Sequence, residues 1–475
     1  MSPDQNATLV FIPFPVLSHQ AAAVQLAELL VSRDPRLSVA IILMKLPIDT
    51  KTGSSPEKTS PDSRIHFVHL PPDESGFATS TESPKLLVDR FVTSQQGPVR
   101  DAVSKLIETG SQTKPSRLAG FVVDMFCTAM VDVAHELGVP SYVFFTCSAS
   151  CLGLLLHLQG LVDFENRDLK EYKDSDEAAS ISVPTYGSPV PVRVWPEMVF
   201  DGESIFLNFA RKFRETKGII VNTFLELEPR AVRALVNLPP VYPVGPIIQY
   251  SNEDNKELDE ITKWLDEKPD SSVVFLCFGS RGSFDADQVR EIAAALERIG
   301  CGFLWSLRKP APKGKFEFPG EFENVGEFLP DGFLERISGF GKVIGWAPQV
   351  AVLAHRAVGG FVSHCGWNST LESVWCGVPM AVWPLAAEQQ ANAFQLVTEL
   401  GIAVEIKMDY KRDSGVIVPA DRIERAVGEL MGTENEGRRA KVRALSETSR
   451  AVMSEGGSSY EFLGRFIDDV LENGA

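Results

Sequence analysis

The stretch FVSHCGWNSTLES, from Phe361 to Ser373, decides how the second half of this chain is interpreted. It follows two glycines, and Gly359 to Ser363 has the continuous apolar character of a buried strand. Polar residues and a glycine come next, and then a helical pattern begins at about Asn368 or Ser369. Unpaired N–H groups and the dipole at a helix N-terminus bind anions, so this stretch could hold a phosphate although it contains no lysine or arginine.

A purely structural interpretation of the same residues is equally open at this point. Ser369 and Glu372 have the spacing of a capping box, in which both side chains serve the helix end. Gly366 and Gly377 could be turn residues only.

Beyond this stretch, short β-rich apolar runs alternate with segments of helical period along the whole chain. Continuous apolar strands separated by helices predict parallel sheets covered on both faces. The pattern occurs in both halves and predicts two doubly wound α/β domains. The strand-and-helix pairs that indicate this are TLVFIPF with QAAAVQLAELLVSR, LAGFVVD with AMVDVAHELG, SVVFLCFGS with DQVREIAAALERIG, and GGFVSH with TLESVWCG.

The domain boundary is placed by LPPVYPVGPII, Leu238 to Ile248, which is rich in proline and precedes an acidic polar run. We therefore predict an N-terminal domain over 1–248, a linker over 249–258 and a C-terminal domain over 259–455. The remaining residues, 456–475, form an amphipathic helix that we expect to pack back on the N-terminal domain.

Bulk properties exclude several classes of function. A net charge of -17 argues against nucleic-acid or anionic-membrane partners. The N-terminus lacks the pattern of a signal peptide, and the apolar run 142–162 contains polar residues that favour a strand and a buried helix over a membrane span. Seven cysteines, an odd number without CxxC spacing, indicate reduced thiols. We expect a cytoplasmic monomer that uses no metal.

Ligands of doubly wound sheets bind beyond the carboxyl ends of the strands. Polar or aromatic residues follow seven predicted strands, which predicts a cleft between the two domains. These residues are His19, Asp124, Thr146, Ser280, Ser306, Trp346 and His364.

A longer stretch carries a resemblance. From Trp346 to Gln389 the chain reads WAPQVAVLAHRAVGGFVSHCGWNSTLESVWCGVPMAVWPLAAEQ. This resembles the signature motif of the plant family-1 UDP-sugar-dependent glycosyltransferases, and the likeness extends over the whole chain. The resemblance implies a GT-B-like fold with two facing Rossmann-type domains. It also implies an inverting, metal-independent transfer of glucose from UDP-glucose to a small lipophilic acceptor, giving a β-glucoside.

The resemblance implies a role for each matching residue. Trp346 would stack on uracil beside Ala347, Gln349 and Ser306, and Glu372 would hold the ribose. The diphosphate would meet the 364–369 turn and Ser280, and the sugar would meet Trp367, Glu388, Gln389 and Thr146. The implied UDP-sugar site is Ser18, Thr146, Ser280, Ser306, Trp346, Ala347, Gln349, His364, Gly366, Trp367, Asn368, Ser369, Glu372, Glu388 and Gln389.

The resemblance also implies that His19 is the general base and that Asp124 orients it. An imidazole titrates near neutral pH and can take the proton of an attacking hydroxyl, while a buried carboxylate fixes its tautomer. From the residues alone, His19 could be a loop residue, and Asp124 could cap the next helix at Thr128.

Acceptor identity is open in the sequence. Phe126 and Ala386 are candidate acceptor-pocket residues, although Phe126 could equally belong to the core. Ala386 stands where many relatives carry an aromatic residue, which would widen the pocket. Flavonoids and other phenolics fit the likeness best, and a terpenoid acceptor is the alternative. Arg281, next to Ser280, could reach a ligand or solvent.

Three rival functions are compatible with parts of the sequence. A metal-dependent glycosyltransferase would use a DxD motif, and two such strings occur, at 174–176 and 285–287. A nicotinamide enzyme would need GxGxxG, which the run 278–283 imitates poorly. A non-catalytic UDP-sugar-binding protein would need neither His19 nor Asp124.

Overall fold

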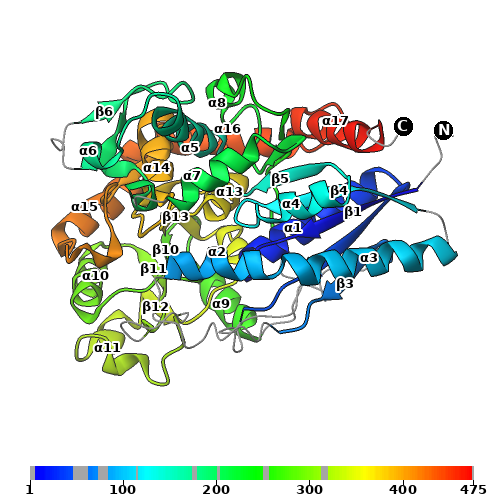
Figure 1. Ribbon diagram of the computed structural model, residues 1–475. Coiled ribbons are helices and arrows are strands. Elements are labelled where there is room, and N and C mark those ends of the chain that lie inside the picture. Colours follow the sequence, from blue (N-terminus) through cyan, green and yellow to red (C-terminus); the bar gives the residue numbers. More distant parts are fainter. Residues whose placement is uncertain are drawn as a thin grey trace. The chain divides into compact units, whose positions relative to one another are not determined.

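The computed structural model describes residues 6–46, 62–72, 84–113, 116–173, 179–200, 204–249, 256–311 and 319–472 (Figure 1). Contacts divide the chain into two compact units. Unit 1 comprises Met1–Leu169, Met198–Gln249 and Ala451–Ala475, and unit 2 comprises Lys170–Glu197 and Tyr250–Arg450. Each unit is built around its own sheet.

Unit 1 contains a parallel sheet of seven strands in the order β3-β2-β1-β4-β5-β8-β9. The order reverses between β1 and β4, which is the arrangement of a doubly wound fold. The strands are β1 (Asn6–Ile12), β2 (Leu37–Leu43), β3 (Ile65–His69), β4 (Ser116–Asp124), β5 (Ser141–Phe145), β8 (Gly218–Val221) and β9 (Val241–Pro243). Its helices are α1 (Leu17–Arg33), α2 (Pro84–Ser94), α3 (Gln96–Thr113), α4 (Met130–Glu136), α5 (Ala149–Asp163), α7 (Ile205–Phe213), α8 (Pro229–Ala234) and α17 (Ser458–Glu472).

Unit 2 contains a parallel sheet of six strands in the order β12-β11-β10-β13-β14-β15, with its reversal between β10 and β13. The strands are β10 (Val273–Cys277), β11 (Gly302–Ser306), β12 (Gly341–Ile344), β13 (Val358–Ser363), β14 (Met380–Val382) and β15 (Ala403–Glu405), with a separate antiparallel pair β6 (Ser180–Ile181) and β7 (Val190–Pro191). Its α-helices are α6 (Lys170–Lys173), α9 (Lys256–Asp266), α10 (Ala286–Arg298), α11 (Phe333–Ile337), α12 (Gln349–Leu353), α13 (Trp367–Cys376), α14 (Gln389–Phe394), α15 (Ala420–Met431) and α16 (Glu436–Ala451).

Short helical turns complete the described part of the chain. The 3₁₀ turns are η3 (Val192–Val194), η4 (Glu197–Phe200), η5 (Val325–Glu327), η7 (Arg412–Ser414) and η8 (Thr433–Asn435), and η6 (Gln395–Glu399) is a π-helical turn that continues α14.

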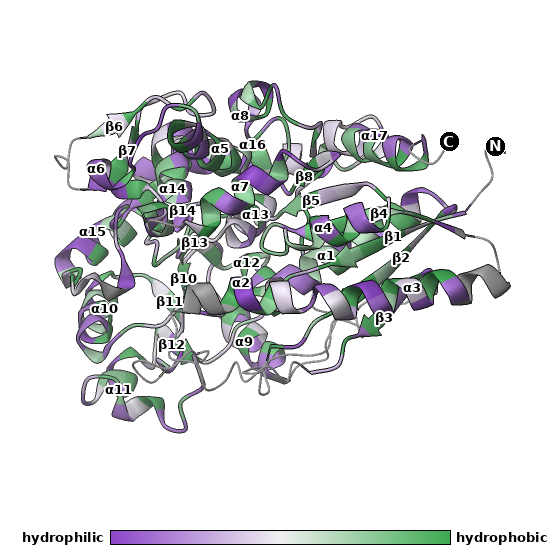
Figure 2. Cartoon of the chain, viewed as in Figure 1, coloured by the Kyte–Doolittle hydropathy of each residue, from purple (hydrophilic) through white to green (hydrophobic). Residues whose placement is uncertain are grey.

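The central strands of both sheets are buried on their two faces, as the continuous apolar runs predicted. All five residues of β10 are buried, and so are all six of β13. The helices around the sheets carry both hydrophobic and hydrophilic residues (Figure 2). The run 142–162 forms β5 and the largely buried helix α5, as expected, and no helix in the described ranges is long and apolar enough to cross a membrane.

Helix starts differ from the sequence-based expectation at two points that matter for the site. Ser18 and His19 lie in the first turn of α1, which begins at Leu17, and not in a loop before it. Helix α13 begins at Trp367, one or two residues earlier than expected, with Gly366 as its N-cap. Each shift places polar side chains on a helix end rather than on a free loop.

The units do not follow the predicted boundaries at every point. Lys170–Glu197 lies within 1–248 in sequence but groups with unit 2. Most of the linker predicted over 249–258 falls outside the described residues. Helix α17 belongs to unit 1, where it lies against β9 and α1 (Figure 1).

Aromatic packing holds α17 on unit 1. Phe466 is fully buried and packs edge-on against Tyr142 and Tyr242, with ring centroids 5.0 Å and 5.4 Å away. Arg117 Nη2 donates to the carbonyls of Val470 and Leu471 at 2.9 Å and 2.6 Å. The end of the chain is thereby part of the core of unit 1.

Phe466→Ala should lower the free energy of unfolding of unit 1 by about 3–5 kcal/mol, because it leaves a cavity between two tyrosine rings. Urea denaturation followed by circular dichroism measures this, and Glu461→Ala, on the exposed face of the same helix, is the control. Unfolding of Phe466→Ala at the wild-type urea concentration would contradict this packing of α17.

Candidate functional site

The order reversal in unit 1 brings His19 against Asp124. His19 follows β1, Asp124 ends β4, and these strands are neighbours. His19 Nδ1 lies 2.7 Å from Asp124 Oδ2, and the aspartate side chain is 1% exposed against 17% for the histidine. A neutral imidazole that donates from Nδ1 to this carboxylate carries its lone pair on Nε2. The pair therefore has the arrangement of a base and its orienting carboxylate.

The other oxygen of Asp124 is also engaged. Oδ1 accepts the backbone N–H of Phe126 at 2.9 Å. Helix α4 begins at Met130 with Ala129 as its N-cap, so the alternative in which Asp124 caps this helix at Thr128 is wrong.

Aromatic rings surround His19 in unit 1. Phe14 lies edge-on to the imidazole at 5.9 Å, and Phe126 lies tilted at 5.4 Å. Phe126 is half-buried, and behind it stand Phe206 and Phe209 of α7 at 6.0 Å and 5.7 Å. Of these rings only Phe126 was predicted from the sequence. The three- and four-residue spacing of phenylalanines in IFLNFARKF was the signal that could have identified the face of α7.

Thr146 is nearly buried at the carboxyl end of β5, and its hydroxyl contacts Met125 Sδ at 3.8 Å. Close by in sequence, α5 begins against a buried carboxylate. Glu228 accepts the N–H groups of Ala149 and Ser150, both at 2.9 Å, and the hydroxyl of Thr223 at 2.5 Å. The N-terminus of α5 is thus already satisfied by an internal anion.

Ser18 lies in the first turn of α1, next to His19. Its carbonyl oxygen accepts a hydrogen bond from Gln249 Nε2 at 2.9 Å, which links Gln249 to the first turn of α1.

His364 follows β13, next to the point where the strand order of unit 2 reverses. Its ring lies between two glycines, since a Cβ on Gly279 would meet His364 Nε2 at 2.7 Å and a Cβ on Gly366 would meet it at 2.5 Å. Burial lowers the pKa of His364 to about 4, so the ring is neutral at pH 7. Its Nδ1 and the Oδ1 of Asn368 are buried without a hydrogen-bond partner among the described residues.

The backbone between β13 and α13 is held in a rare conformation. Cys365 has a φ of 64°, in the left-handed region that non-glycine residues seldom occupy. The N-cap of α13 is Gly366, which has no side chain to cap the helix, whereas the Glu228 carboxylate binds the start of α5. A strained turn followed by an uncapped helix is a common form of phosphate site.

Ser369 and Glu372 lie inside α13, so the capping-box interpretation is wrong. Gln349 Nε2 donates to both, at 2.8 Å to Ser369 Oγ and 2.5 Å to Glu372 Oε2. Glu372 is 8% exposed, and burial raises its pKa to about 7 although the bond from Gln349 opposes the rise.

The predicted uracil residues lie just beyond β12 and β11. Trp346 is 40% exposed, unusually for its size, whereas Ala347 is buried. The Ser306 hydroxyl donates to the carbonyl of Gly345 at 2.6 Å. The exposed ring of Trp346 therefore follows Gly345, whose carbonyl is held by the Ser306 hydroxyl at the end of β11.

Two of the predicted sugar-binding residues, Glu388 and Gln389, lie at the end of the motif that runs from Trp346 to Gln389. Gln389 is the first residue of α14, and its Oε1 accepts the N–H groups of Leu385 and Ala386 at 2.8 Å and 3.0 Å. Glu388, directly before it, is half-buried, and Ala386 is exposed. Trp367 is only 2% exposed.

Ser280 and Arg281 are exposed, and the Arg281 carbonyl accepts a hydrogen bond from Arg412 Nη1 at 3.0 Å.

Comparisons with known proteins find relatives along nearly the whole chain. The family described as "UDP-glucoronosyl and UDP-glucosyl transferase" matches residues 212–418. A "UDP-glucose flavonoid 3-O-glucosyltransferase 6" from Fragaria ananassa is 51% identical, over 97% of this chain and 98% of the relative. This chain belongs to the plant family-1 UDP-glycosyltransferases.

Solved structures of UDP-glycosyltransferases share the fold. A "ugt transferase" from Siraitia grosvenorii, solved with UDP, is 46% identical over 98% of this chain and 100% of that chain, with a TM-score of 0.89. UGT71G1 of Medicago truncatula, solved with UDP-glucose, is 37% identical over 98% of each chain, with a TM-score of 0.83. The two doubly wound sheets of this UDP-glycosyltransferase are those of the GT-B fold, as expected from the sequence.

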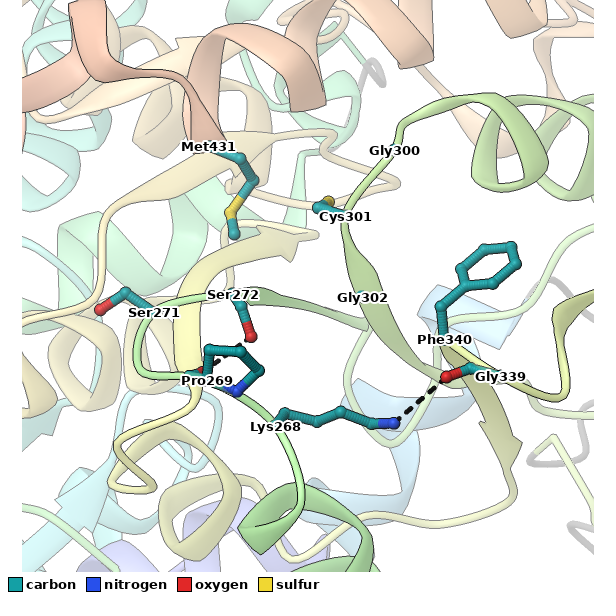
Figure 3. Close-up of a pocket in the computed structure, with 10 residues that line it drawn as sticks. All are labelled: Lys268, Pro269, Ser271, Ser272, Gly300, Cys301, Gly302, Gly339, Phe340 and Met431. Carbon is teal, nitrogen blue, oxygen red and sulfur yellow. Dashed lines mark hydrogen bonds between the residues drawn. The ribbon is translucent and has the colours of Figure 1, made fainter.

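A shallow cavity of about 370 Å³ lies at the amino ends of β10 and β11 in unit 2 of this UDP-glycosyltransferase (Figure 3). It is lined by Cys301, whose thiol pKa burial raises to about 11, and by Lys268, which donates to the Gly339 carbonyl at 3.3 Å. The cavity lies at the strand ends opposite to those that carry His364 and Trp346.

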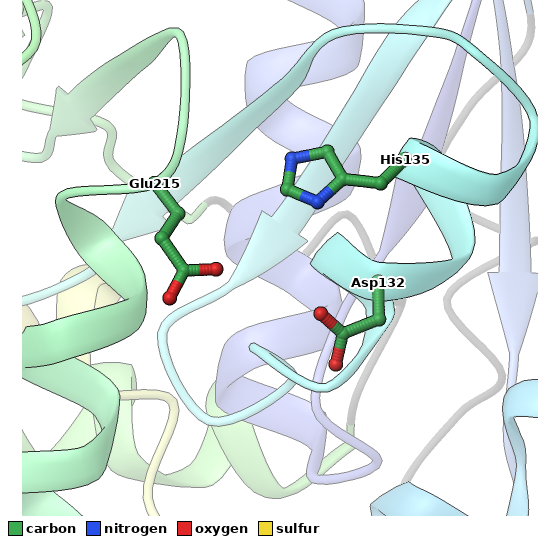
Figure 4. A group of neighbouring side chains, drawn as sticks. All are labelled: Asp132, His135 and Glu215. Atoms are coloured by element: carbon green, nitrogen blue, oxygen red, sulfur yellow. The ribbon is translucent and has the colours of Figure 1, made fainter.

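A carboxylate and imidazole cluster in unit 1 has metal-ligand geometry. The ligand atoms of Asp132, His135 and Glu215 lie within 4.8 Å of one another (Figure 4). Lys212 Nζ donates to Asp132 and Glu215 at 2.8 Å and 2.9 Å, so a lysine ammonium already bridges the two carboxylates. The cluster links α4 to α7.

The motifs behind the rival functions either serve the fold or lie outside the described residues. The DxD string at 174–176 lies outside them. In the other string, Asp285 is the N-cap of α10, and Asp287 pairs with Arg290 in the first turn. The glycine run after β10 is followed by α10 only at Ala286, so it does not form the tight strand-to-helix turn of a dinucleotide site.

Gly279→Ala should destabilise unit 2 by about 1–3 kcal/mol more than Gly300→Ala. Both glycines have a left-handed backbone, but only the new Cβ at Gly279 would meet the His364 ring, while Gly300 has open space around it. Thermal unfolding measures the difference, and in a His364→Ala background it should vanish. Equal losses for the two alanine variants would show that His364 does not lie against Gly279.

Proposed function

We propose that this chain is an inverting, metal-independent glucosyltransferase that moves glucose from UDP-glucose to a hydroxyl of a flavonoid or related phenolic. The observation that carries the proposal is the His19–Asp124 pair, 2.7 Å apart and nearly excluded from water on the aspartate side. A UDP-sugar-binding protein without catalysis would need no such pair.

In the proposed reaction His19 Nε2 takes the proton of the acceptor hydroxyl as its oxygen attacks the anomeric carbon. Asp124 holds the ring by Nδ1 and stabilises the imidazolium that forms. The bond from the anomeric carbon to the diphosphate breaks in the same step. A single displacement at an α-linked donor gives a β-glucoside.

Unit 2 would bind the leaving diphosphate through the 361–373 stretch, which contains no lysine or arginine. Support comes from the uncapped start of α13 and from the neutral His364 with its unpartnered Nδ1. Neutral donors at a helix N-terminus stabilise the growing charge and still allow the product UDP to leave. Ser280, Gly366, Asn368 and Ser369 would complete this set.

The nucleoside and sugar would occupy neighbouring parts of unit 2. The exposed ring of Trp346 suits stacking on uracil, with Ala347, Gln349 and Ser306 around it. Glu372 would accept the ribose hydroxyls. Gln389, Glu388 and Trp367 would bind the glucose hydroxyls, with Thr146 of unit 1 as a further donor.

The acceptor would lie beside His19 in unit 1. The half-buried Phe126, backed by two phenylalanines of α7, offers an aromatic wall suited to a flat phenolic. The name of the Fragaria ananassa relative supports this acceptor class. Ala386, small and exposed, leaves space where a larger side chain would stand.

We propose that the enzyme works as a monomer in the cytoplasm. Both the base pair and the α13 terminus belong to one chain, so no second copy is needed to complete the chemistry. All seven cysteines are free, which supports a reducing compartment.

His19→Ala should reduce kcat with UDP-glucose by about 10²- to 10⁴-fold and leave the Kd of UDP within about twofold, since the base is not needed for nucleotide binding. Asp124→Asn should give a loss of similar order. Product formation from an aglycone panel, read by mass spectrometry in EDTA, measures this, with UDP-galactose and UDP-xylose as donor controls. His135→Ala, an exposed histidine of α4, should keep the parental rate.

Parental turnover by His19→Ala would refute the proposed base. Loss of turnover in EDTA, restored by a divalent cation, would refute the metal-independent mechanism.

Binding of UDP should release protons at Glu372. The buried carboxyl is partly protonated in the free protein because its pKa is about 7, and ribose hydroxyls that donate to the carboxylate lower that pKa. The Kd of UDP should therefore fall by up to about tenfold per pH unit as pH rises towards 7. Calorimetry in buffers of different ionisation enthalpy measures the released protons.

Glu372→Gln is the control for the ionisation of UDP itself. The variant should lose the part of the pH dependence that the carboxyl contributes and keep the part that belongs to the phosphate. An identical pH profile in wild type and Glu372→Gln would contradict the assignment of this residue to the ribose.

A further inference from the structure

Residues 179–197, here called the β6–β7 segment, form a compact hairpin in unit 2 although they lie between α5 and α7 of unit 1 in sequence. Ser180 pairs with Pro191, and Ile181 with Val190, in antiparallel register. Side chains of the segment are deeply buried, with Val190 and Trp195 at 0% exposure and Tyr186 at 3%. The segment therefore groups with unit 2 and contains several fully buried side chains, unlike an exposed loop.

The β6–β7 segment contacts the helix that begins at Gln389. Turn η3 of the segment lies against α14. The Tyr186 ring packs on Phe394, the last residue of α14, with centroids 5.9 Å apart. Glu399, the last residue of the π-helical turn that continues α14, accepts the N–H groups of Gly187 and Ser188 at 2.6 Å and 2.9 Å.

On its other side α14 is bonded to the turn that carries His364. Asn392 Nδ2 donates to the carbonyl of Cys365 at 3.0 Å, and both residues are fully buried. Gln390 Nε2 donates to the carbonyl of Tyr410 at 2.7 Å. Helix α14 is thus held between the β6–β7 segment and the 364–366 turn.

This arrangement makes the first turn of α14 depend on both supports. Gln389 uses its Oε1 to hold the backbone of Leu385 and Ala386, so the direction of its amide nitrogen follows the position of α14. The two hydrogen bonds that Glu399 accepts are charge-assisted, and such bonds are roughly twice as strong as those between neutral groups. π-helical turns of this kind often lie at functional sites.

We propose that the β6–β7 segment positions α14 and thereby sets the selectivity for the donor sugar, with Glu399 and Tyr186 as positioning residues. The inference rests on the proposed function, because it assigns the sugar to Gln389 and Glu388. It adds a determinant that lies in the N-terminal half of the sequence and outside the 346–389 motif.

Glu399→Gln keeps the size of the side chain and removes the charge that the two N–H groups meet. KM for UDP-glucose should rise about fivefold to tenfold, and the preference for UDP-glucose over UDP-galactose should narrow by a similar factor. The Kd of UDP, which lacks the sugar, should stay within twofold. This split separates a positioning role from a general loss of structure, which would weaken UDP as well.

Glu197→Gln is the matched control. Glu197 lies at the end of the same segment and pairs with Lys173 and Lys411 at 3.5 Å and 3.7 Å, and its side chain is 50% exposed. The same substitution there removes a charge from the segment without touching α14, so both KM and donor preference should remain parental.

Tyr186→Leu is a second, independent test that removes the ring contact with Phe394, and it carries the proposal if Glu399→Gln does not fold. It should change KM and donor preference in the same direction. Parental donor kinetics in a folded Glu399→Gln or Tyr186→Leu enzyme, or an equal weakening of UDP and UDP-glucose, would overturn the inference. If the wild-type chain binds UDP but turns over no UDP-sugar, the proposed function itself fails.

Discussion

The reversal of strand order in each sheet is the constraint on which the rest of the structure depends. Where the order reverses, the connections from two neighbouring parallel strands leave to opposite faces, and their carboxyl ends remain side by side. In unit 1 this sets His19, after β1, against Asp124, at the end of β4. In unit 2 it sets Gly279, after β10, against His364, after β13. The same topology thus produces two different chemical groupings.

The two groupings differ in their electrostatics. The unit 1 pair joins an imidazole to a buried carboxylate, with His19 Nδ1 2.7 Å from Asp124 Oδ2. The unit 2 histidine has no carboxylate against its buried Nδ1 among the described residues, and burial keeps it neutral. In the proposed reaction the first histidine accepts a proton, while the second is neutral near pH 7 because of its burial. The residue type is the same, and the neighbours decide its use.

Much of the architecture could be predicted from the sequence, because apolar strands of a parallel sheet and the periods of its helices are local signals. The run GGFVSH predicted β13, and LAGFVVD predicted most of β4. Helix starts were harder to predict. Leu17 and Trp367 begin helices without a side-chain cap, so no cap residue marks these starts in the sequence. The capping-box spacing of Ser369 and Glu372 instead predicted a later start for α13. Those two residues bind Gln349, a partner that no spacing rule reveals.

Contacts between distant segments were likewise invisible in the sequence. Gly279 looked like part of a poor dinucleotide motif, yet its lack of a side chain makes room for His364. The β6–β7 segment lies before the proline-rich and acidic runs that mark the predicted boundary, so the sequence predicts it as part of the first domain, whereas its contacts group it with unit 2. Local chemistry predicts what a residue can do, and the fold decides which partner it meets.

Glu228 has a consequence for the way the two halves divide their ligands. Its carboxylate occupies the amino end of α5, a helix that follows a strand of its sheet as α13 does. A free phosphate would find that position already filled by a negative group of the protein. The start of α5 is therefore unsuited to a second phosphate site, which agrees with the proposal that the nucleotide binds to unit 2.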